Sequence, residues 1–246
     1  MGRQAFLLSS FGLFLGLLIV FLTGNEGWPG STPVTGDDSS LVSTSAMSSE
    51  LVDAATRITL PRTRRFSSTK DLFCLGVGVR AKSIAVVKVN VYTVGLYVDA
   101  KPAKGTLKNF KGKKPAKLSG DASLYKVLGQ PGFTKYLHLI FARAVEAQKV
   151  VDALTAVKGV SSDVLSSFSS MLLGAIGDKI GKGESISLGW EGKDKMVVLV
   201  RDKAVGSIKD PSLPIAIFDL YLGSSAVSEV AKQAFAEGVS NLLLSS

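Results

Sequence analysis

The chain has very few of the side chains that most often carry metal or nucleophilic chemistry. Among its 246 residues there is one cysteine, Cys74, and one histidine, His138. A single cysteine excludes an intrachain disulfide and a cluster of thiolate ligands. A single histidine, without a second histidine or a cysteine near it, gives little support to a zinc site or a Ser-His-Asp hydrolase. We therefore expect Cys74 to be a small core residue, and we expect no metal and no cofactor.

Motifs for nucleotides and nucleic acids are also missing. The glycines of GVGVR, residues 76–80, are followed by more β-type sequence instead of a helix, so they do not match a dinucleotide-binding loop. The chain is basic, with a net charge of +9, and seven of its lysines lie in residues 101–117 among Gly and Pro residues. This stretch predicts an exposed loop or, alternatively, a patch that contacts acidic lipid headgroups. No zinc-finger or RNA-recognition motif accompanies it, so we expect no nucleic-acid partner.

Charged residues are absent from residues 6–23, an 18-residue apolar run. As a helix this run would be about 27 Å long, close to the thickness of a bilayer core. We predict that residues 1–24 form an N-terminal hydrophobic helix, either a signal anchor or a cleaved signal peptide. Arg3 precedes the run, and no Lys or Arg occurs between Asn25 and Thr56. The positive-inside rule then predicts a single span, with the following domain on the non-cytoplasmic side of a membrane.

Residues 25–68 are rich in Gly, Ser, Thr and Pro, and this composition predicts a disordered linker. A hydrophobic leader followed by a Ser/Thr-rich stretch is also similar to the bipartite leaders of proteins sent to plastids of secondary origin. A plastid is therefore the alternative location. The acidic residues Glu26, Asp37 and Asp38 count against it, because transit peptides avoid acidic side chains. Residues 69–246 remain for one globular domain.

Two β-type segments begin this domain and organise its predicted site. Residues 72–82 and 86–98 are rich in β-branched side chains and are separated by a short polar break, which predicts two antiparallel strands. Because side chains alternate along a strand, each segment has residues on a common face. These are Gly76, Gly78 and Arg80 on the first segment, and Asn90, Tyr92, Val94 and Leu96 on the second. Bare glycine backbone beside an arginine leaves room for a ligand on this face.

Helical and β-type patterns alternate through the rest of the domain. Apolar residues at helical spacing predict helices over residues 146–157 and after a cap at Ser161 or Ser162, and further helices after Ser212 and Ser228. Residues 185–190 and 195–202 flank a polar turn and predict a hairpin. Strands early and late in the domain, with helices between and after them, predict an α+β domain in which helices cover one face of an antiparallel sheet.

Three blocks of this sequence resemble a known family. LGVGVRAKSI, VYTVGLYVDA and FDLYLGSSAVSEVAK, in this order, resemble the chalcone isomerase domain and, within that family, its fatty-acid-binding branch, which does not isomerise. The resemblance covers roughly residues 69–245. It implies a chalcone isomerase-like open-faced β-sandwich, with a ligand cleft between an antiparallel sheet and a layer of helices.

The resemblance also implies roles for five positions. In the isomerases an arginine on the first strand, a threonine on the second, a tyrosine and an asparagine on the following helix, and a Ser or Thr near the last block meet the charge of the reacting flavonoid. In this sequence the arginine is kept as Arg80, and the other positions fall at Tyr92, Glu146, Ala153 and Leu220. Four of the five positions therefore differ in type, which argues against isomerase activity.

The fatty-acid-binding branch instead uses an arginine and a tyrosine from the two strands to hold a carboxylate, and Arg80 and Tyr92 supply these groups. A guanidinium and a phenol O–H can satisfy both oxygens of a carboxylate. Leu220 suits a hydrocarbon chain, and a chain of about 12 carbons offers about 10 kcal/mol of burial before association costs. We expect a non-catalytic protein that binds a fatty acid or a similar small apolar carboxylate. The alternatives are a chalcone isomerase and a membrane-tethered interaction domain with a vestigial cleft.

Overall fold

The computed structural model describes residues 48–67, 70–84 and 87–245 of the chain. The apolar run at residues 6–23 and the first part of the expected linker lie outside these ranges, so the predicted N-terminal hydrophobic helix stays a prediction. None of the described helices is long and apolar enough to cross a membrane.

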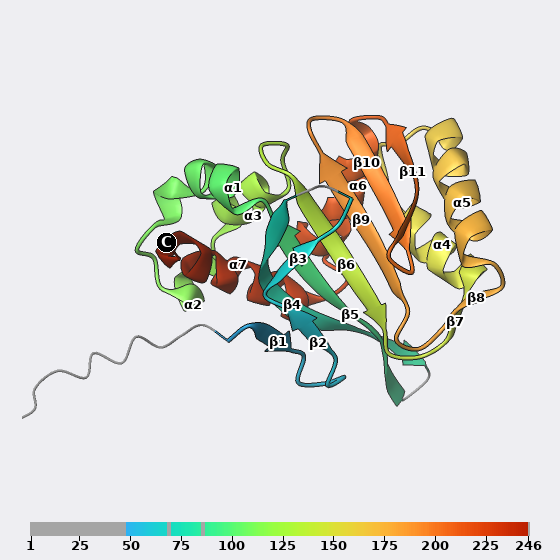
Figure 1. Cartoon of the computed structure of the whole chain (residues 1–246), viewed down its shortest axis with the longest axis horizontal. Coiled ribbons are helices and arrows are strands. Elements are labelled where there is room, and N and C mark those ends of the chain that lie inside the picture. Colours follow the sequence, from blue (N-terminus) through green and yellow to red (C-terminus); the bar gives the residue numbers. More distant parts are fainter. Residues whose placement is uncertain (1–47, 68–69, 85–86, 246) are drawn as a thin grey trace, which may run out of the picture. The chain divides into compact units, whose positions relative to one another are not determined.

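A curved, seven-stranded antiparallel sheet forms the centre of the fold (Figure 1). Its strand order is β11-β10-β9-β6-β5-β4-β3. The predicted opening strands are confirmed as β4 and β5, which lie side by side, and the predicted hairpin is confirmed as β9 and β10. The strands are β3 (Thr63–Arg65), β4 (Asp71–Ile84), β5 (Val87–Val98), β6 (Lys135–Phe141), β9 (Ser185–Glu191), β10 (Lys195–Val200) and β11 (Lys203–Lys209).

Helices cover one face of this sheet, which we call the inner face, and the main hydrophobic core lies between the two layers. The covering helices are α4 (Ala147–Thr155), α5 (Ser162–Ile176), α6 (Ser212–Leu222) and α7 (Glu229–Leu244). Helix α7 begins at the predicted cap Ser228, whose Oγ accepts from Ala231 N at 3.1 Å. The same hydroxyl donates to Val79 O at 2.6 Å and so attaches the start of α7 to β4.

Helix α7 lies directly on the glycines of β4. A Cβ atom at Gly76 would overlap the carbonyl of Ala234, and one at Gly78 would stand 2.5 Å from Ala231 Cα. Gly238 of α7 makes the reciprocal approach, because a Cβ there would overlap the carbonyl of Leu75. The sequence pattern predicted a ligand in the space over these glycines, but a helix of the same chain fills that space.

The opposite, outer face is partly covered by residues whose composition predicted a linker. Strands β1 (Glu50–Val52) and β2 (Thr59–Pro61) form a hairpin, and β3 extends the main sheet. Leu60 is fully buried there in a second core with Leu72, Tyr97 and Tyr136. The prediction of a disordered linker through residue 68 is therefore wrong for residues 48–67. A few apolar side chains are enough to order this segment because the sheet supplies the rest of the core.

The lysine-rich stretch is helical, contrary to the predicted loop. It contains α1 (Ala100–Thr106), a short 3₁₀ turn η1 (Lys108–Phe110) and α2 (Pro115–Leu118), and helix α3 (Ala122–Leu128) follows. Buried apolar residues hold these short helices: Ala103, Leu107, Phe110 and Leu118. All of its seven lysines except Lys104 are exposed, so the stretch is solvated as expected.

Candidate functional site

Arg80 and Tyr92, the predicted carboxylate-binding pair, lie directly opposite each other on β4 and β5. The guanidinium carbon stands 5.6 Å from the centroid of the tyrosine ring, within the range of a cation–π contact. A β-bulge at this point inserts Val91 as an extra residue on β5. The bulge shifts the alternation of side chains along β5 by one residue, so Asn90 and Tyr92 point to opposite faces of the sheet. The Asn90 amide donates to Ala55 O in the β1–β2 turn. The prediction that Asn90 shares a face with Tyr92 is therefore wrong.

The hydroxyl of Tyr92 pairs with that of Tyr221 on α6 at 2.7 Å, and both side chains are buried. Burial raises the pKa of both phenols, although the positive charge of Arg80 partly opposes the rise. Both tyrosines therefore keep their hydroxyl proton at neutral pH. Their mutual hydrogen bond uses one of the two protons, and no other acceptor within the described ranges takes the second. The pair retains one O–H that can donate to a ligand.

Tyr221 was not among the residues predicted for the site. The residue predicted for this part of the site was its neighbour, because Tyr221 follows Leu220 directly in the third block of the resemblance. Leu220 itself is half-buried against the main core and lines neither the cavity nor the groove described below. The residue that reaches the predicted tyrosine therefore lies one position further along α6.

A small apolar cavity of about 30 Å³ lies beside Tyr92, between the sheet and α4. Leu139 and Phe141 of β6 and Val150 and Leu154 of α4 form its apolar walls. A cavity of this size has room for about one water molecule. The cavity adjoins a much larger groove, because Arg80, Val91, Val145, Lys149 and Ala153 line both spaces.

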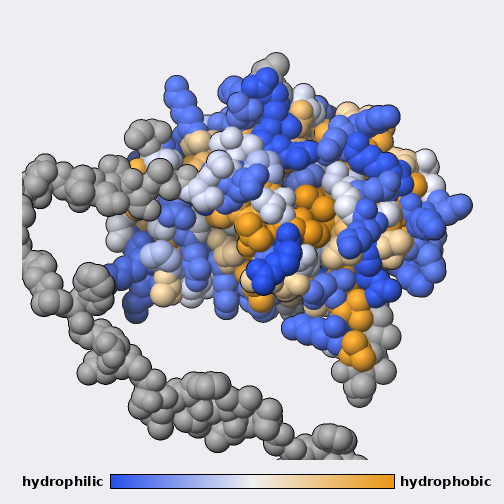
Figure 2. Space-filling view, turned by 60° about the horizontal axis from the view of Figure 1, so that its bottom comes forward, coloured by the Kyte–Doolittle hydropathy of each residue, from blue (hydrophilic) through white to orange (hydrophobic). Residues whose placement is uncertain are grey.

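This larger groove has a volume of about 490 Å³, and charged side chains surround it. Five of them are cationic and one is acidic: Arg80, Lys82, Arg143, Lys149, Lys179 and Glu146. Glu146 forms an ion pair with Lys149 at 3.0 Å. The described parts of β4 and β5 nearest the hairpin turn project from the body at the lower right of Figure 2, where hydrophobic and hydrophilic side chains lie together. The groove thus combines apolar and cationic walls.

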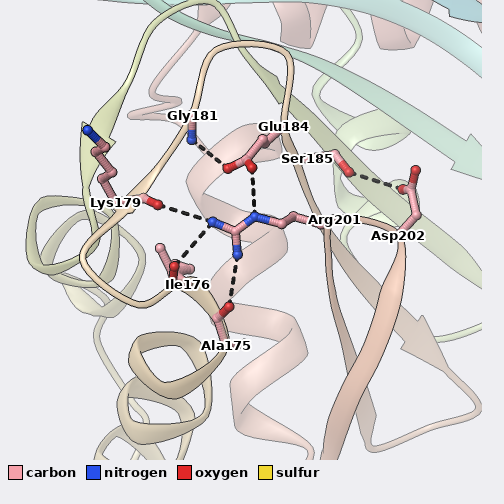
Figure 3. A network of polar contacts seen from close by, with 8 residues as sticks. All are labelled: Ala175, Ile176, Lys179, Gly181, Glu184, Ser185, Arg201 and Asp202. Atoms are coloured by element: carbon pink, nitrogen blue, oxygen red, sulfur yellow. Dashed lines mark hydrogen bonds and ion pairs between the residues drawn. The ribbon is translucent and has the colours of Figure 1, made fainter.

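A polar network fixes the short β-ladder beside the groove, formed by β7 (Val145–Glu146) and β8 (Lys179–Ile180). Arg201 donates to Glu184 Oε1 at 2.8 Å and also to three backbone carbonyls, those of Ala175, Ile176 and Lys179 (Figure 3). Glu184 in turn accepts from Gly181 N at 2.6 Å. The Lys179 ammonium points away from this network in Figure 3. The network therefore holds the backbone of Lys179 and leaves its charged end for the groove.

The structure brings most of the family-derived positions together. Arg80 and Ala153 line both spaces, Tyr92 lines the cavity, and Glu146 lines the groove. The small side chain of Ala153 and the exposed charge of Glu146 stand at positions to which the resemblance assigns polar groups of the isomerases. No group of His, Cys, Asp and Glu side chains that could hold a metal ion occurs in the part of the chain that the structure describes.

Comparisons with known proteins agree with this fold. The chain is 27% identical over 180 residues to fatty-acid-binding protein 1 of Arabidopsis thaliana, covering 68% of this chain and 64% of that protein. It thus spans less than two thirds of that relative. A crystal structure of an Arabidopsis thaliana fatty-acid-binding protein superposes with a TM-score of 0.68 at 22% identity, covering 80% of this chain and 100% of that chain. No family model matches the sequence.

These findings define the fold of the described domain. The described domain has the chalcone isomerase-like α+β fold, with a curled antiparallel sheet and helices. The resemblance that the three sequence blocks predicted is confirmed: the chain is similar to fatty-acid-binding proteins of that fold.

Proposed function

We propose that the protein binds fatty acids without converting them, and that Arg80 and Tyr92 hold the carboxylate. The observation that carries this proposal is the convergence of a guanidinium and a spare phenol O–H at an apolar cavity. A carboxylate taken out of water needs charge-assisted hydrogen bonds to both oxygens, and these two groups can supply them. The similarity to a fatty-acid-binding protein of Arabidopsis thaliana supports the same ligand class.

The acyl chain requires the cavity to open. About 30 Å³ cannot hold a chain of many methylenes, so Val150 and Leu154 of α4 must separate from Leu139 and Phe141 of β6 when the ligand enters. Helix α4 has nine residues, and its displacement exchanges side-chain contacts for contacts with the ligand. Burial of the chain at about 0.8 kcal/mol per methylene provides the driving force. The small cavity is also what a vestigial cleft would show, so only binding measurements separate these two hypotheses.

Isomerase activity has less support at this site. Ala153 offers no polar group to a substrate, and Leu220 does not reach the groove or the cavity. Of the five positions that act in the isomerases, only the arginine is kept, as Arg80. Cyclisation of a chalcone faster than in buffer alone would nevertheless favour this alternative over simple binding.

The first test is native mass spectrometry of the chain purified from bacteria, with solvent extraction of what co-purifies, followed by calorimetric titration with laurate and palmitate. We expect one fatty acid per chain, and we expect Arg80→Ala to weaken binding about 50-fold because a charge-assisted pair is lost. Ala153→Trp should block the entrance that the cavity and the groove share. Lys126→Ala, on the exposed side of α3, is the control. Wild-type affinity in Arg80→Ala would contradict the proposal, and no uptake by the wild type would favour the interaction domain.

A further inference from the structure

The groove outside Arg80 carries more positive charge than one carboxylate requires. Its five cationic side chains face a single acid, Glu146, which is already paired with Lys149. The other four, Arg80, Lys82, Arg143 and Lys179, make no ion pair with any residue in the described ranges. If Arg80 takes the carboxylate, three further cations line the same space with no anion assigned to them.

This excess is local and does not simply reflect the basic composition of the chain. A groove of similar volume on the outer face is lined by Lys70 and Lys195 but also by Asp99 and Glu191, so its charges balance. The groove between α3 and α6 is lined by two lysines and one aspartate. The groove at Arg80 is therefore the most positive of these three large hollows.

The three further cations come from three different elements. Lys82 lies on β4, Arg143 in the connection between β6 and β7, and Lys179 on β8, whose backbone Arg201 holds. Charged groups that line one groove from separate elements can contact an anion with several oxygens, such as a phosphate, from more than one side. The groove volume of about 490 Å³ lies within the range of sites for whole small molecules. A carboxylate alone would fill only a small part of it.

We propose that the acyl ligand carries a phosphate-bearing head, which lies in the groove among Lys82, Arg143 and Lys179. This inference rests on the proposed function, because the acyl chain takes the same cavity beside Tyr92. The carbonyl oxygen of an ester or thioester accepts the spare phenol O–H as a carboxylate oxygen does, and the head then extends outward past Arg80. Two sources share this chemistry: a lysophospholipid with a phosphate head, and an acyl thioester of coenzyme A.

The test compares palmitate, 1-palmitoyl lysophosphatidate and palmitoyl-coenzyme A, which have the same acyl chain, by calorimetry of the full chain below the aggregation threshold of each ligand. We expect at least one phosphate-bearing ligand to bind roughly 10-fold tighter than palmitate at low salt. The preference should shrink at high salt, because exposed charges are screened. Whichever phosphate-bearing ligand binds more tightly identifies the source of the head.

Two triple variants with the same net charge separate the groove from the general charge of the protein. The first variant is Lys82→Gln/Arg143→Gln/Lys179→Gln. It should reduce the affinity for the phosphate-bearing ligand to about the affinity for palmitate, and it should change the palmitate affinity less than about threefold. Lys101→Gln/Lys108→Gln/Lys111→Gln removes three exposed lysines of the α1–η1 region and should leave the preference unchanged.

The outcomes distinguish this inference from the proposed function. Palmitate that binds as tightly as both phosphate-bearing ligands would overturn the inference and leave fatty-acid binding intact. Equal losses in the two triple variants would overturn it as well. A phosphate-bearing ligand that binds through the three groove cations, while palmitate and laurate do not bind, would support the inference about the head and overturn the free fatty acid as ligand.

Discussion

The two faces of the sheet bury similar polar side chains in opposite ways. On the outer face Tyr97 donates its hydroxyl to Pro61 O at 2.9 Å, and the Tyr136 hydroxyl lies 2.5 Å from both Ser67 Oγ and Glu191 Oε1. His138 Nδ1 pairs with Ser187 Oγ at 2.8 Å. On the inner face the Tyr92–Tyr221 pair keeps one hydroxyl proton for which the described residues offer no acceptor, and Arg80 beside it forms no ion pair with any of these residues.

This difference separates polar groups that hold the fold from groups that can bind a ligand. Buried polar atoms in proteins are almost always hydrogen-bonded, so a buried donor with no acceptor points to a partner outside the chain. The outer face has its own exceptions, Arg62 Nη1 and Arg64 Nε, which are buried and unpaired. Their guanidinium groups lie over the rings of Phe73 and Phe66, and neither residue lines a cavity or groove described above. Arg80 differs because it lies where a groove meets an apolar cavity.

The largest effect on stability should come from breaking the close contact between α7 and β4 on the inner face. In Gly238→Ala the new Cβ overlaps the carbonyl of Leu75, so α7 must move away from β4. We expect the free energy of unfolding to fall by roughly 3 kcal/mol or more, measured by urea denaturation, despite the better helix propensity of alanine. Gly174→Ala in α5 is the matched control. It meets no atom within 4 Å and should raise stability by about 0.5 to 1 kcal/mol. A similar change in the free energy of unfolding of both variants would contradict the close contact between Gly238 and Leu75.

Local signals in the sequence predicted much of this fold. The period-2 pattern gave β4 and β5, and serines before apolar runs gave the caps of α5 and α7, where Ser161 accepts from Val164 N and Ser228 from Ala231 N. These features depend on residues within a few positions of one another, so they can be found without knowing what lies across the domain. Together with the family resemblance they also placed Arg80 opposite Tyr92.

Features that depend on distant parts of the chain could not be found in this way. Gly76 and Gly78 suggested an open surface because nothing in their neighbourhood indicates the approach of α7, more than 150 residues later. Leu60 lies in a Ser/Thr-rich stretch and becomes ordered only against the outer face of the sheet. The bulge at Val91 and the contact of Tyr92 with Tyr221 likewise arise from pairing between elements, and no single segment encodes them.

The outer face can be tested by its response to acid. Burial, together with the nearby charge of Arg64, lowers the pKa of His138 to about 3, while Asp202 opposes the shift. The unfolded chain takes up a proton at this histidine below a pH of about 6.5, but the folded chain does not. The stability that His138 contributes is therefore complete above pH 6.5 and is lost as the pH falls toward 3. By pH 4.5 the loss should reach about 2.5 kcal/mol.

The control for this titration is His138→Gln, which keeps a polar partner for Ser187 but cannot titrate. Unfolding free energies of both proteins at pH 7 and pH 4.5 give the contribution of the histidine as the difference between the two acid-induced losses. Carboxylates that titrate in both proteins cancel in this difference. Equal losses in the two proteins would mean that the histidine is not held neutral on the outer face.

The smallest effects distinguish the two faces most directly, because they separate stability from binding. Tyr97→Phe removes an outer-face hydrogen bond and leaves Pro61 O unpaired, so the free energy of unfolding should fall by about 1 kcal/mol with no change in fatty-acid affinity.

Tyr92→Phe/Tyr221→Phe removes both partners of the inner-face pair with little change of shape, so stability should change by less than about 0.5 kcal/mol. Laurate affinity should instead fall about 10-fold, because the spare O–H is gone. Urea denaturation and calorimetry on the same two preparations measure both quantities. If the double variant lost stability and kept its ligand, the inner pair would be structural like the outer tyrosines, and Arg80 alone would remain to hold the head of the fatty acid.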